Sequence, residues 1–261
     1  WPGLPELPEV ETIRRDLLAG VMGRRLVKVT IARPETVRQP ATREFCSRLA
    51  GQKVEHVYRR GKFLLLSLSS GETLIIHLRM TGVLRLKPKS ASPDSHTTAI
   101  FLLDNGQALH FNDRRRLGMM WLVKEPAQII GKLGIEPLEP GFTPGAMSRL
   151  FSQRAVPIKA LLCEQHLIAG VGNMYADEAL FAARMHPLKK GKDLTSEEML
   201  RLHRAIRQVL QDGISHEGAS VDTYCRPDGG LGTAHRFFKV AHRGGAVCDV
   251  CHSTIERIEV R

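Results

Sequence analysis

The spacing of apolar residues changes at about residue 146 of this chain of 261 residues. Short apolar runs separated by turn-forming segments predict strands at 26–31, 62–68, 73–78, 99–103 and 119–123. Farther along, apolar residues recur at helical spacing, which predicts helices at 143–151, 158–168, 174–185 and 195–214. Thr195 and Glu198 are a candidate capping box at the start of the last of these helices. This order predicts an α+β fold in which a β-sandwich or barrel precedes a helical region.

Two boundaries divide the chain further. The segment 136–145 holds three prolines and two glycines, which is typical of a linker. From about residue 235, short β-like runs return around a pair of cysteines. We therefore predict four parts: an N-terminal β-sandwich domain with a leading helix over 1–135, the linker over 136–145, a helical domain over 146–234 and a terminal hairpin over 235–261.

Charge and cysteine usage narrow the choice of partners. The formal net charge of +11 favours a polyanionic partner, although an ordinary basic enzyme could carry the same charge. The five cysteines are odd in number and mostly scattered, which argues against a disulfide framework.

No apolar run approaches the roughly 18 residues of a membrane span, and no signal peptide pattern is seen. We expect a cytoplasmic protein with no membrane partner.

The stretch "PELPEVET" at 5–12 predicts the start of a helix. Pro8 suits the first helical position, because the N–H group that it lacks would have no partner there. Glu9 and Glu11 would complement the helix dipole. A buried stripe would follow at Val10, Ile13 and Leu17.

Helix initiation does not explain the preceding pair, Pro5-Glu6. A proline at a chain terminus has a secondary amine, which can condense with an aldehyde-like carbon to give an iminium ion. A neighbouring carboxylate could then act as acid and base in the proton transfers. The pair therefore indicates covalent catalysis, provided that Pro5 is the first residue.

Six segments of the chain resemble one known family. They are "PELPEVET" (5–12), "RRGKFL" (59–64), "HLRMTG" (77–82), "NDRRRLG" (112–118), "AGVGNMYADEALF" (169–181) and "CDVC" (248–251). In order and spacing they resemble the formamidopyrimidine-DNA glycosylases, enzymes of base-excision repair. The resemblance implies an N-terminal β-sandwich, a helical domain with a helix–two-turn–helix motif, and a zinc-finger hairpin that is incomplete here.

The resemblance also implies a chemistry. In the family the mature chain starts at the proline that matches Pro5, and its amine attacks C1′ of a damaged nucleotide. Glu6 would protonate the opening sugar and later shuttle protons during β,δ-elimination. Lys62 matches a lysine that contacts phosphate near the lesion and assists catalysis, although a lone lysine between two strands is more commonly a solvated turn residue.

Three further residues match positions that fill the space left when the lesion leaves the duplex. They are Met80, Arg115 and Leu117. Leu117 stands where phenylalanine is usual, and leucine should wedge less well because it stacks poorly on bases. Outside the segment "HLRMTG", Met80 would be interpreted as a core methionine.

Phosphate contacts are implied for His96 and Asn173, and proximity to DNA is implied for Lys159. Gly170 and Gly172 would allow turns with positive φ before a helix that begins near Asn173, and the free N–H groups of that helix could hold a phosphate. An ordinary glycine-containing connection between two helices is the alternative for this segment. A lone histidine or asparagine is also usually structural.

The loop at 218–232 matches the flexible lid over the extruded base. Ser220, Thr223 and Tyr224 are its expected contacts. The loop is about one residue shorter than the usual pattern, and a glycine-rich polar loop is also typical of an ordinary surface.

Two features depart from the family pattern. Residues 1–4 would hold the Pro5 nitrogen in a peptide bond, and we expect that this prefix is artefactual or is removed; otherwise the protein lacks the usual chemistry. Cys248 and Cys251 supply two thiolates, whereas a structural Zn²⁺ needs four ligands. We expect the second pair to lie beyond the residues given, with His252 as a candidate third ligand and a redox pair as the alternative.

Three functions follow. The first is a glycosylase and abasic-site (AP) lyase that removes oxidised purines, such as 8-oxoguanine and formamidopyrimidines, from double-stranded DNA. The second is a catalytically silent protein that binds lesions or abasic sites. The third is a glycosylase for oxidised pyrimidines of the endonuclease VIII type, which generally opens with Pro-Glu-Gly-Pro-Glu. We expect a monomer, associated with the nucleoid if the source is bacterial.

Overall fold

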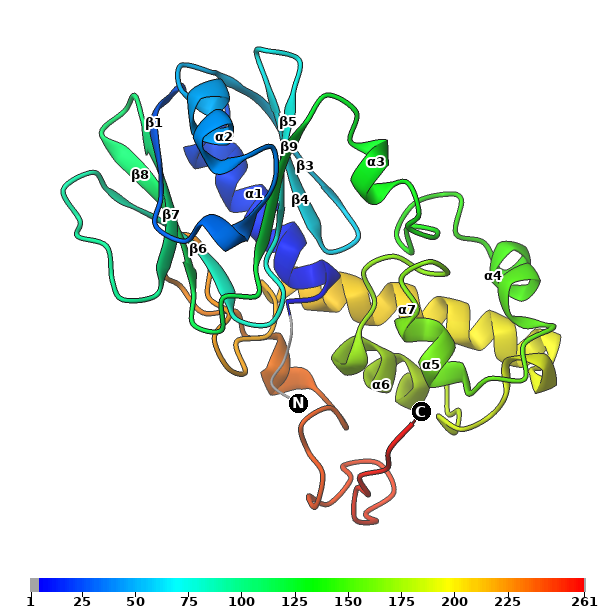
Figure 1. The fold of residues 1–261 in the computed structure, drawn as a ribbon. Helices are drawn as coiled ribbons and strands as arrows, with labels where there is room; N and C mark the ends of the chain where they lie inside the picture. Colours follow the sequence, from blue (N-terminus) through cyan, green and yellow to red (C-terminus); the bar gives the residue numbers. More distant parts are fainter. Residues whose placement is uncertain (1–4, 261) are drawn as a thin grey trace.

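The computed structural model describes residues 5–260, which form a sandwich half and a helical half (Figure 1). The strands are β1 (Leu26–Ile31), β2 (Val37–Gln39), β3 (Val54–Arg60), β4 (Phe63–Leu68), β5 (Thr73–His77), β6 (Gly82–Pro88), β7 (Thr97–Leu103), β8 (Gln107–Asp113) and β9 (Met119–Val123). The helices are α1 (Leu7–Gly20), α2 (Thr42–Leu49), α3 (Ala127–Ile130), α4 (Pro144–Phe151), α5 (Ile158–Cys163), α6 (Asn173–Ala182) and α7 (Ser196–Ser215). Three short 3₁₀ helices complete the elements, at Pro34–Thr36, Gly191–Asp193 and Ala234–Phe237. The predicted α+β fold is confirmed.

The strands form two sheets of a sandwich. One sheet has the order β1-β7-β8-β6, and the other has the order β2-β9-β5-β4-β3. Neighbouring strands are antiparallel except for the parallel pair β2 and β9. All five predicted runs are strands, but β2, β3, β6 and β8 were not separately predicted. In β3 and β6 charged residues interrupt the apolar ones, so these strands are evident mainly from their pairing.

Helix α1 joins the cores of the two halves. Leu7 packs in the core of the helical half, whereas the predicted stripe at Val10, Ile13 and Leu17 packs between the sheets. The stripe is confirmed, with each of its side chains at most 1% exposed. The predicted position of Pro8 is wrong by one residue, because the helix begins at Leu7 with Glu6 as its N-cap.

The helical half follows the prediction with two differences. The predicted capping box between Thr195 and Glu198 at the start of α7 is confirmed. Helix α5 ends at Cys163 rather than at 168, because the Gln165 side chain binds backbone groups of the following loop. Helix α4 begins at Pro144, within the segment assigned to the linker, and Phe142 of that segment is buried. The division into domains at 135 and 146 stays a prediction.

The last part of the described chain differs from the prediction. Within 235–260 the structure has no strand, and the expected β-like runs reduce to a single bridge between Val247 and Thr254. Few apolar side chains of this segment are buried, so it lacks the packing that would hold a hairpin. The prediction that the prefix is artefactual or removed concerns residues 1–4, which lie outside the described residues. Among the described helices, none combines the length and the apolar character that a membrane span requires.

Candidate active site

The carboxylate of Glu6 occupies the amino-terminal turn of α6. It accepts hydrogen bonds from the backbone N–H groups of Gly172 (2.7 Å), Met174 (2.9 Å) and Tyr175 (3.4 Å). Helix N-termini attract anions because their N–H groups have no partner within the helix. The glycines before α6 predict a phosphate at these N–H groups, but in the structure the carboxylate of Glu6 accepts their hydrogen bonds.

Gly172 has no side chain, and the space that this leaves is occupied by the side chains of Glu6 and Lys62. A Cβ atom at this position would lie 2.5 Å from Cδ of Glu6 and 2.7 Å from Nζ of Lys62, so no other residue fits. The predicted positive φ is found at Gly170 (95°), whereas Gly172 has a φ of −135°. Gly172 is therefore required for close approach rather than for a left-handed turn.

Burial raises the pKa of Glu6 to about 7, with a smaller contribution in the same direction from Glu9. The ammonium group of Lys62 and the N–H groups of α6 act in the opposite direction and lower this pKa. Glu6 is only 1% exposed, so water cannot stabilise its charged form. At neutral pH Glu6 is therefore suited both to donate and to accept a proton.

Glu9 is a second buried carboxylate and connects three parts of the site. It accepts hydrogen bonds from the N–H of Glu6 (2.8 Å), the hydroxyl of Tyr175 (2.8 Å) and the N–H of Ala219 (2.7 Å). Burial raises its pKa as well. Sequence analysis gave Glu9 only a dipole role, although its spacing of three from the N-cap fits a capping box.

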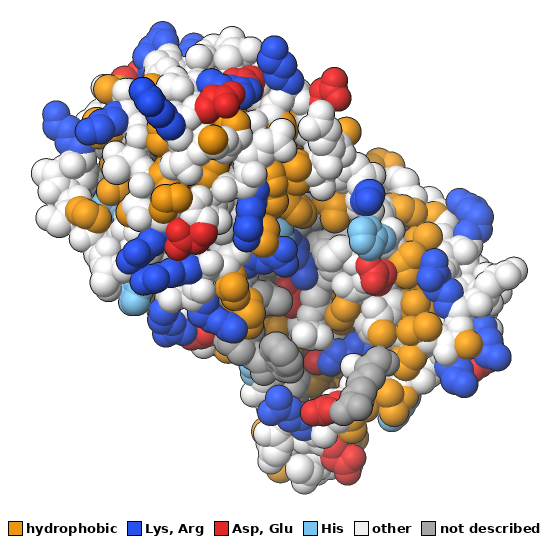
Figure 2. All heavy atoms as spheres, in the orientation of Figure 1, with side chains coloured by type: hydrophobic (Ala, Val, Ile, Leu, Met, Phe, Trp, Pro, Cys, Tyr) orange, Lys and Arg blue, Asp and Glu red, His pale blue; other side chains and the backbone are white. Residues whose placement is uncertain are grey.

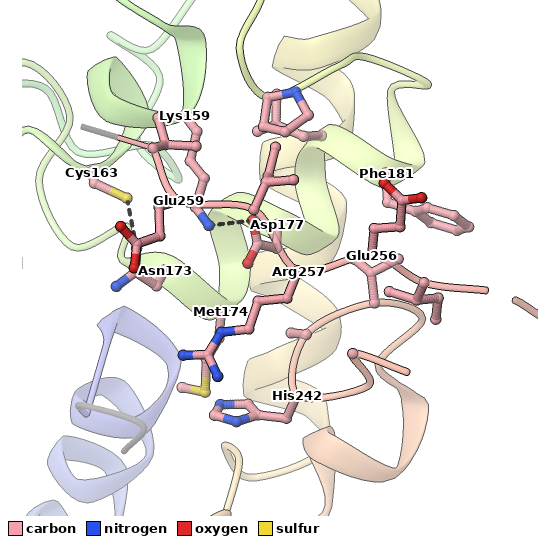
Figure 3. A pocket seen from close by; sticks show the side chains of 18 of the residues that line it. Lys159, Cys163, Asn173, Met174, Asp177, Phe181, His242, Glu256, Arg257 and Glu259 are labelled. Carbon is pink, nitrogen blue, oxygen red and sulfur yellow. Dashed lines mark hydrogen bonds and ion pairs between the residues drawn. The ribbon is translucent and has the colours of Figure 1, made fainter. Parts of the chain in front are cut away.

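An open cleft of about 1080 Å³ lies beside Glu6 and is also lined by Met80, Lys159 and Asn173 (Figure 3). Figure 2 shows a hollow between the two halves with Lys and Arg side chains around it. Lys159 forms an ion pair with Asp177 (2.7 Å). The structure thus brings four of the predicted residues to one cleft.

Cys163 is a lining residue that sequence analysis missed. Its Sγ lies 3.7 Å from Oδ1 of Asn173. Burial raises the pKa of the Cys163 thiol to about 12, so the thiol is protonated and donates to the amide oxygen. Sequence gave no signal for it, because a single cysteine in an amphipathic helix is usually a core residue.

Two turns of the sandwich half hold the residues predicted to fill the duplex. Arg115 Nη1 lies 3.0 Å from Met80 Sδ, and Leu117 is 38% exposed in the same turn as Arg115. The buried carboxylate of Asp113 shapes this turn, since it accepts the N–H groups of Arg115 (3.1 Å) and Gly118 (2.6 Å). The structure brings Met80 and Arg115 into contact, and their role in filling the duplex stays a prediction.

Other predicted residues lie away from the cleft lining. His96 is exposed in the turn before β7, and its carbonyl accepts the N–H of Asp113 (2.8 Å). Ser220 Oγ accepts the N–H of Gly232 (3.0 Å), and Thr223 is half-buried. Tyr224 was expected to contact the base, but it is 3% exposed and packs in the sandwich core. Its large apolar ring makes this burial favourable.

The cysteine pair supplies too few ligands for zinc on its own. Cys248 is buried and Cys251 is exposed. Within 5–260, no group of three or more His, Cys, Asp or Glu residues could hold a metal ion, which leaves His252 without the predicted ligand role. The described residues therefore do not fit a closed structural zinc site, which needs four ligands.

Comparison with known proteins identifies the family. The model of the formamidopyrimidine-DNA glycosylase N-terminal domain matches residues 4–120, and the model of the H2TH domain of the same enzymes matches 133–225. A formamidopyrimidine-DNA glycosylase of Chloroflexus aurantiacus is 44% identical and aligns over 98% of this chain and 93% of its own length. The chain belongs to the formamidopyrimidine-DNA glycosylase family.

Solved structures agree with this assignment. The MutM (Fpg) protein of Thermus thermophilus has a TM-score of 0.89 and 40% identity, covering 98% of this chain and 94% of its own. A complex of the Lactococcus lactis Fpg with DNA containing an abasic site has a TM-score of 0.90 and 30% identity, with 98% and 94% covered. As a member of this family, the protein is a base-excision repair glycosylase. The span that matches the H2TH domain includes α5, α6 and the turn that holds Glu6.

Proposed function

We propose that this glycosylase removes oxidised purines from duplex DNA and cleaves the strand at the resulting abasic site. The observation that carries the proposal is the position of Glu6. Its carboxylate is fully buried, follows Pro5 directly in the chain, borders the cleft and has a pKa of about 7. An acid that must both give and take a proton near neutral pH needs this environment.

The chemistry starts with Pro5. Its secondary amine attacks C1′ of the extruded nucleotide, the bond from C1′ to the base breaks, and the base leaves with a proton. Protonated Glu6 gives its proton to O4′ as the sugar opens, which leaves an iminium ion on Pro5. The Glu6 carboxylate then takes a proton from C2′ as the bond to the 3′ phosphate breaks, and a second elimination breaks the bond to the 5′ phosphate. The active form of the chain is one that begins at Pro5, since the attack needs a free amine.

DNA binding in this proposal uses both halves. Met80, Arg115 and Leu117 fill the space of the extruded nucleotide. Phosphate contacts are assigned to Lys62, Asn173 and His96, and Lys159 is placed near the DNA, in keeping with the net charge of +11. Support comes from a Lactococcus lactis Fpg variant solved with Fapy-dG-containing DNA, which has a TM-score of 0.92 and 30% identity to this chain.

Borohydride trapping tests the proposal. A chain that begins at Pro5 is incubated with an 8-oxoguanine duplex and borohydride, and we expect a covalent protein–DNA complex together with free 8-oxoguanine. The same chain with the prefix retained serves as the control and should not trap through Pro5. Tight binding with neither base release nor trapping would instead support a silent lesion-binding protein.

Oxidised pyrimidines are the second candidate substrate. The wild-type Lactococcus lactis Fpg, with a TM-score of 0.91, was solved with DNA containing an oxidised pyrimidine. Faster release of thymine glycol than of 8-oxoguanine would favour this candidate. A separate measurement, of the metal content of the purified natural protein, tests whether Cys248 and Cys251 take part in a zinc site.

A further inference from the structure

The loop at 218–232 begins next to the catalytic carboxylate. The N–H of Ala219 donates to Glu9 (2.7 Å), and Glu9 also accepts the N–H of Glu6 (2.8 Å). Gly218 lies so close to Glu9 that a Cβ atom there would be 3.0 Å from Cγ of Glu9. The start of the loop is therefore two hydrogen bonds from Glu6.

The later part of the loop is fastened to the sandwich half. We call residues 224–230 the strap. The ring of Tyr224 packs in the sandwich core, and its hydroxyl donates to the carbonyl of Glu217 (2.9 Å). The N–H of Leu86 in β6 donates to the carbonyl of Pro227 (2.8 Å). The strap thus crosses from the end of α7 to the sheet.

Arg226 is the main polar anchor of the strap. Its Nε and Nη2 donate to the two carboxylate oxygens of Asp16 on α1, both at 2.9 Å. Its Nη1 donates to Glu217 (2.8 Å). The Arg226 and Asp16 side chains are 22% and 19% exposed. A two-point contact of this kind, partly shielded from water, is stronger than an ordinary surface ion pair.

The segment between these fixed points is held less firmly. We call residues 220–223 the tip. Val221 and Asp222 are exposed, and Asp222 meets Arg114 in an ion pair of 3.5 Å at the surface. Such an exposed pair contributes little. Ser220 of the tip also accepts the N–H of Gly232 (3.0 Å). The loop therefore consists of a weakly held tip between two firmly anchored ends.

We propose that Arg226, held by Asp16, is a positioning residue for base release, because the fixed strap limits the positions that the tip must search before it closes over an extruded base. The inference rests on the proposed function of the site. Ordering a loop costs conformational entropy, and an anchored loop has already lost part of it. A preformed abasic site presents no base to enclose, so its cleavage should not need the anchor.

The test compares Arg226→Gln, Asp16→Asn and the double variant, all in the chain that begins at Pro5. Single-turnover rates are measured on an 8-oxoguanine duplex and on a duplex with a preformed abasic site. Each single variant should release the base about tenfold more slowly, the factor expected for loss of one charge-assisted contact. The double variant should be no slower than either, and abasic-site cleavage should be unchanged. Hydrogen exchange should become faster at 224–230.

Arg201→Ala is the matched control. It removes the exposed ion pair of Arg201 and Glu197 on α7 (2.9 Å) and a long hydrogen bond to the Ala183 carbonyl (3.4 Å). Neither contact involves the loop at 218–232, so the variant should alter neither rate. Equal losses on the two substrates would overturn the inference, because they would indicate a general structural role for Arg226. Unchanged base release despite faster exchange would overturn it too. An unmodified chain that acts on neither substrate would refute the proposed function itself.

Discussion

The two halves of the molecule act on Glu6, at the proposed active site, through different chemical groups. The sandwich half contributes side chains at turns between strands, namely Lys62, Met80 and Arg115. The helical half contributes backbone N–H groups, of which those of Gly172 and Met174 bind Glu6. Backbone donors fixed by a helix do not need to reorganise during a reaction. The difference teaches that one half holds the acid in place while the other brings positive charge to it.

The first prediction tests whether the acid held by the helical half is essential. Glu6→Gln keeps the size of the side chain but cannot donate the proton, so base release should fall by about 10²–10⁴-fold. Single-turnover release of 8-oxoguanine at pH 7 measures the effect. Glu197→Gln, at an exposed position of α7, is the control and should be fully active. A loss of less than about tenfold would place the acid elsewhere.

The second prediction separates the cores that α1 joins. Leu7 and Leu17 are both 0% exposed, but Leu7 belongs to the helical core and Leu17 to the sandwich core. Replacing either with alanine should lower the free energy of unfolding by about 2–5 kcal/mol. Hydrogen exchange measured at increasing urea concentration reports the stability of each half. Protection should fall in the helical half for Leu7→Ala and in the sandwich half for Leu17→Ala.

The half-exposed Leu200 on α7 provides a control, since Leu200→Ala should have a much smaller effect. If both core variants weakened both halves equally, the chain would unfold as one cooperative unit and the comparison between halves would not extend to stability.

The third prediction concerns stability and pH. The folded pKa of Glu6 is about 7, above its ordinary value of 4.5, so the folded state retains a proton that the unfolded state loses. The extra proton on Glu6 therefore stabilises the folded state fully below pH 4.5, and this stabilisation is lost as the pH rises through 7. The loss lowers the free energy of unfolding by about 3 kcal/mol in all. Unfolding at pH 5 and pH 8 measures it. Glu6→Gln should remove this part of the dependence and be more stable than the natural chain at pH 8, and an unchanged dependence would contradict the assignment.

The fourth prediction tests the charge supplied by the sandwich half. Lys62 lowers the pKa of Glu6, so Lys62→Ala should raise that pKa and move the alkaline limb of the pH–rate profile upward by about one unit. The profile for base release measures the shift. Lys124→Ala removes an exposed lysine that follows β9 and should leave the profile in place. A downward shift would show that Lys62 does not act on Glu6 through its charge.

Local features of the fold could be predicted from sequence. The runs that form β1, β4, β5, β7 and β9, the buried stripe of α1 and the capping box at Thr195 all depend on residues close together in the chain, where periodicity and side-chain type decide the outcome. The strands β3 and β6 were not separately predicted, because only their neighbours in the sheet compensate for their charged residues.

For the proposed site, the sequence alone determined which residues are candidates for the reaction. The order Pro5-Glu6, the Lys62 turn and the glycines before α6 each indicate a chemical role and match a family pattern. The tertiary structure alone decided the hydrogen-bond partners of these residues and the pKa of Glu6. Glu6 meets Gly172 across 166 positions, and Glu9 meets Ala219 across 210. Burial at this junction raises the pKa of Glu6 to about 7, and burial results from the packing of both halves around α1. Desolvation depends on everything that surrounds a group, and no short stretch of sequence contains that information.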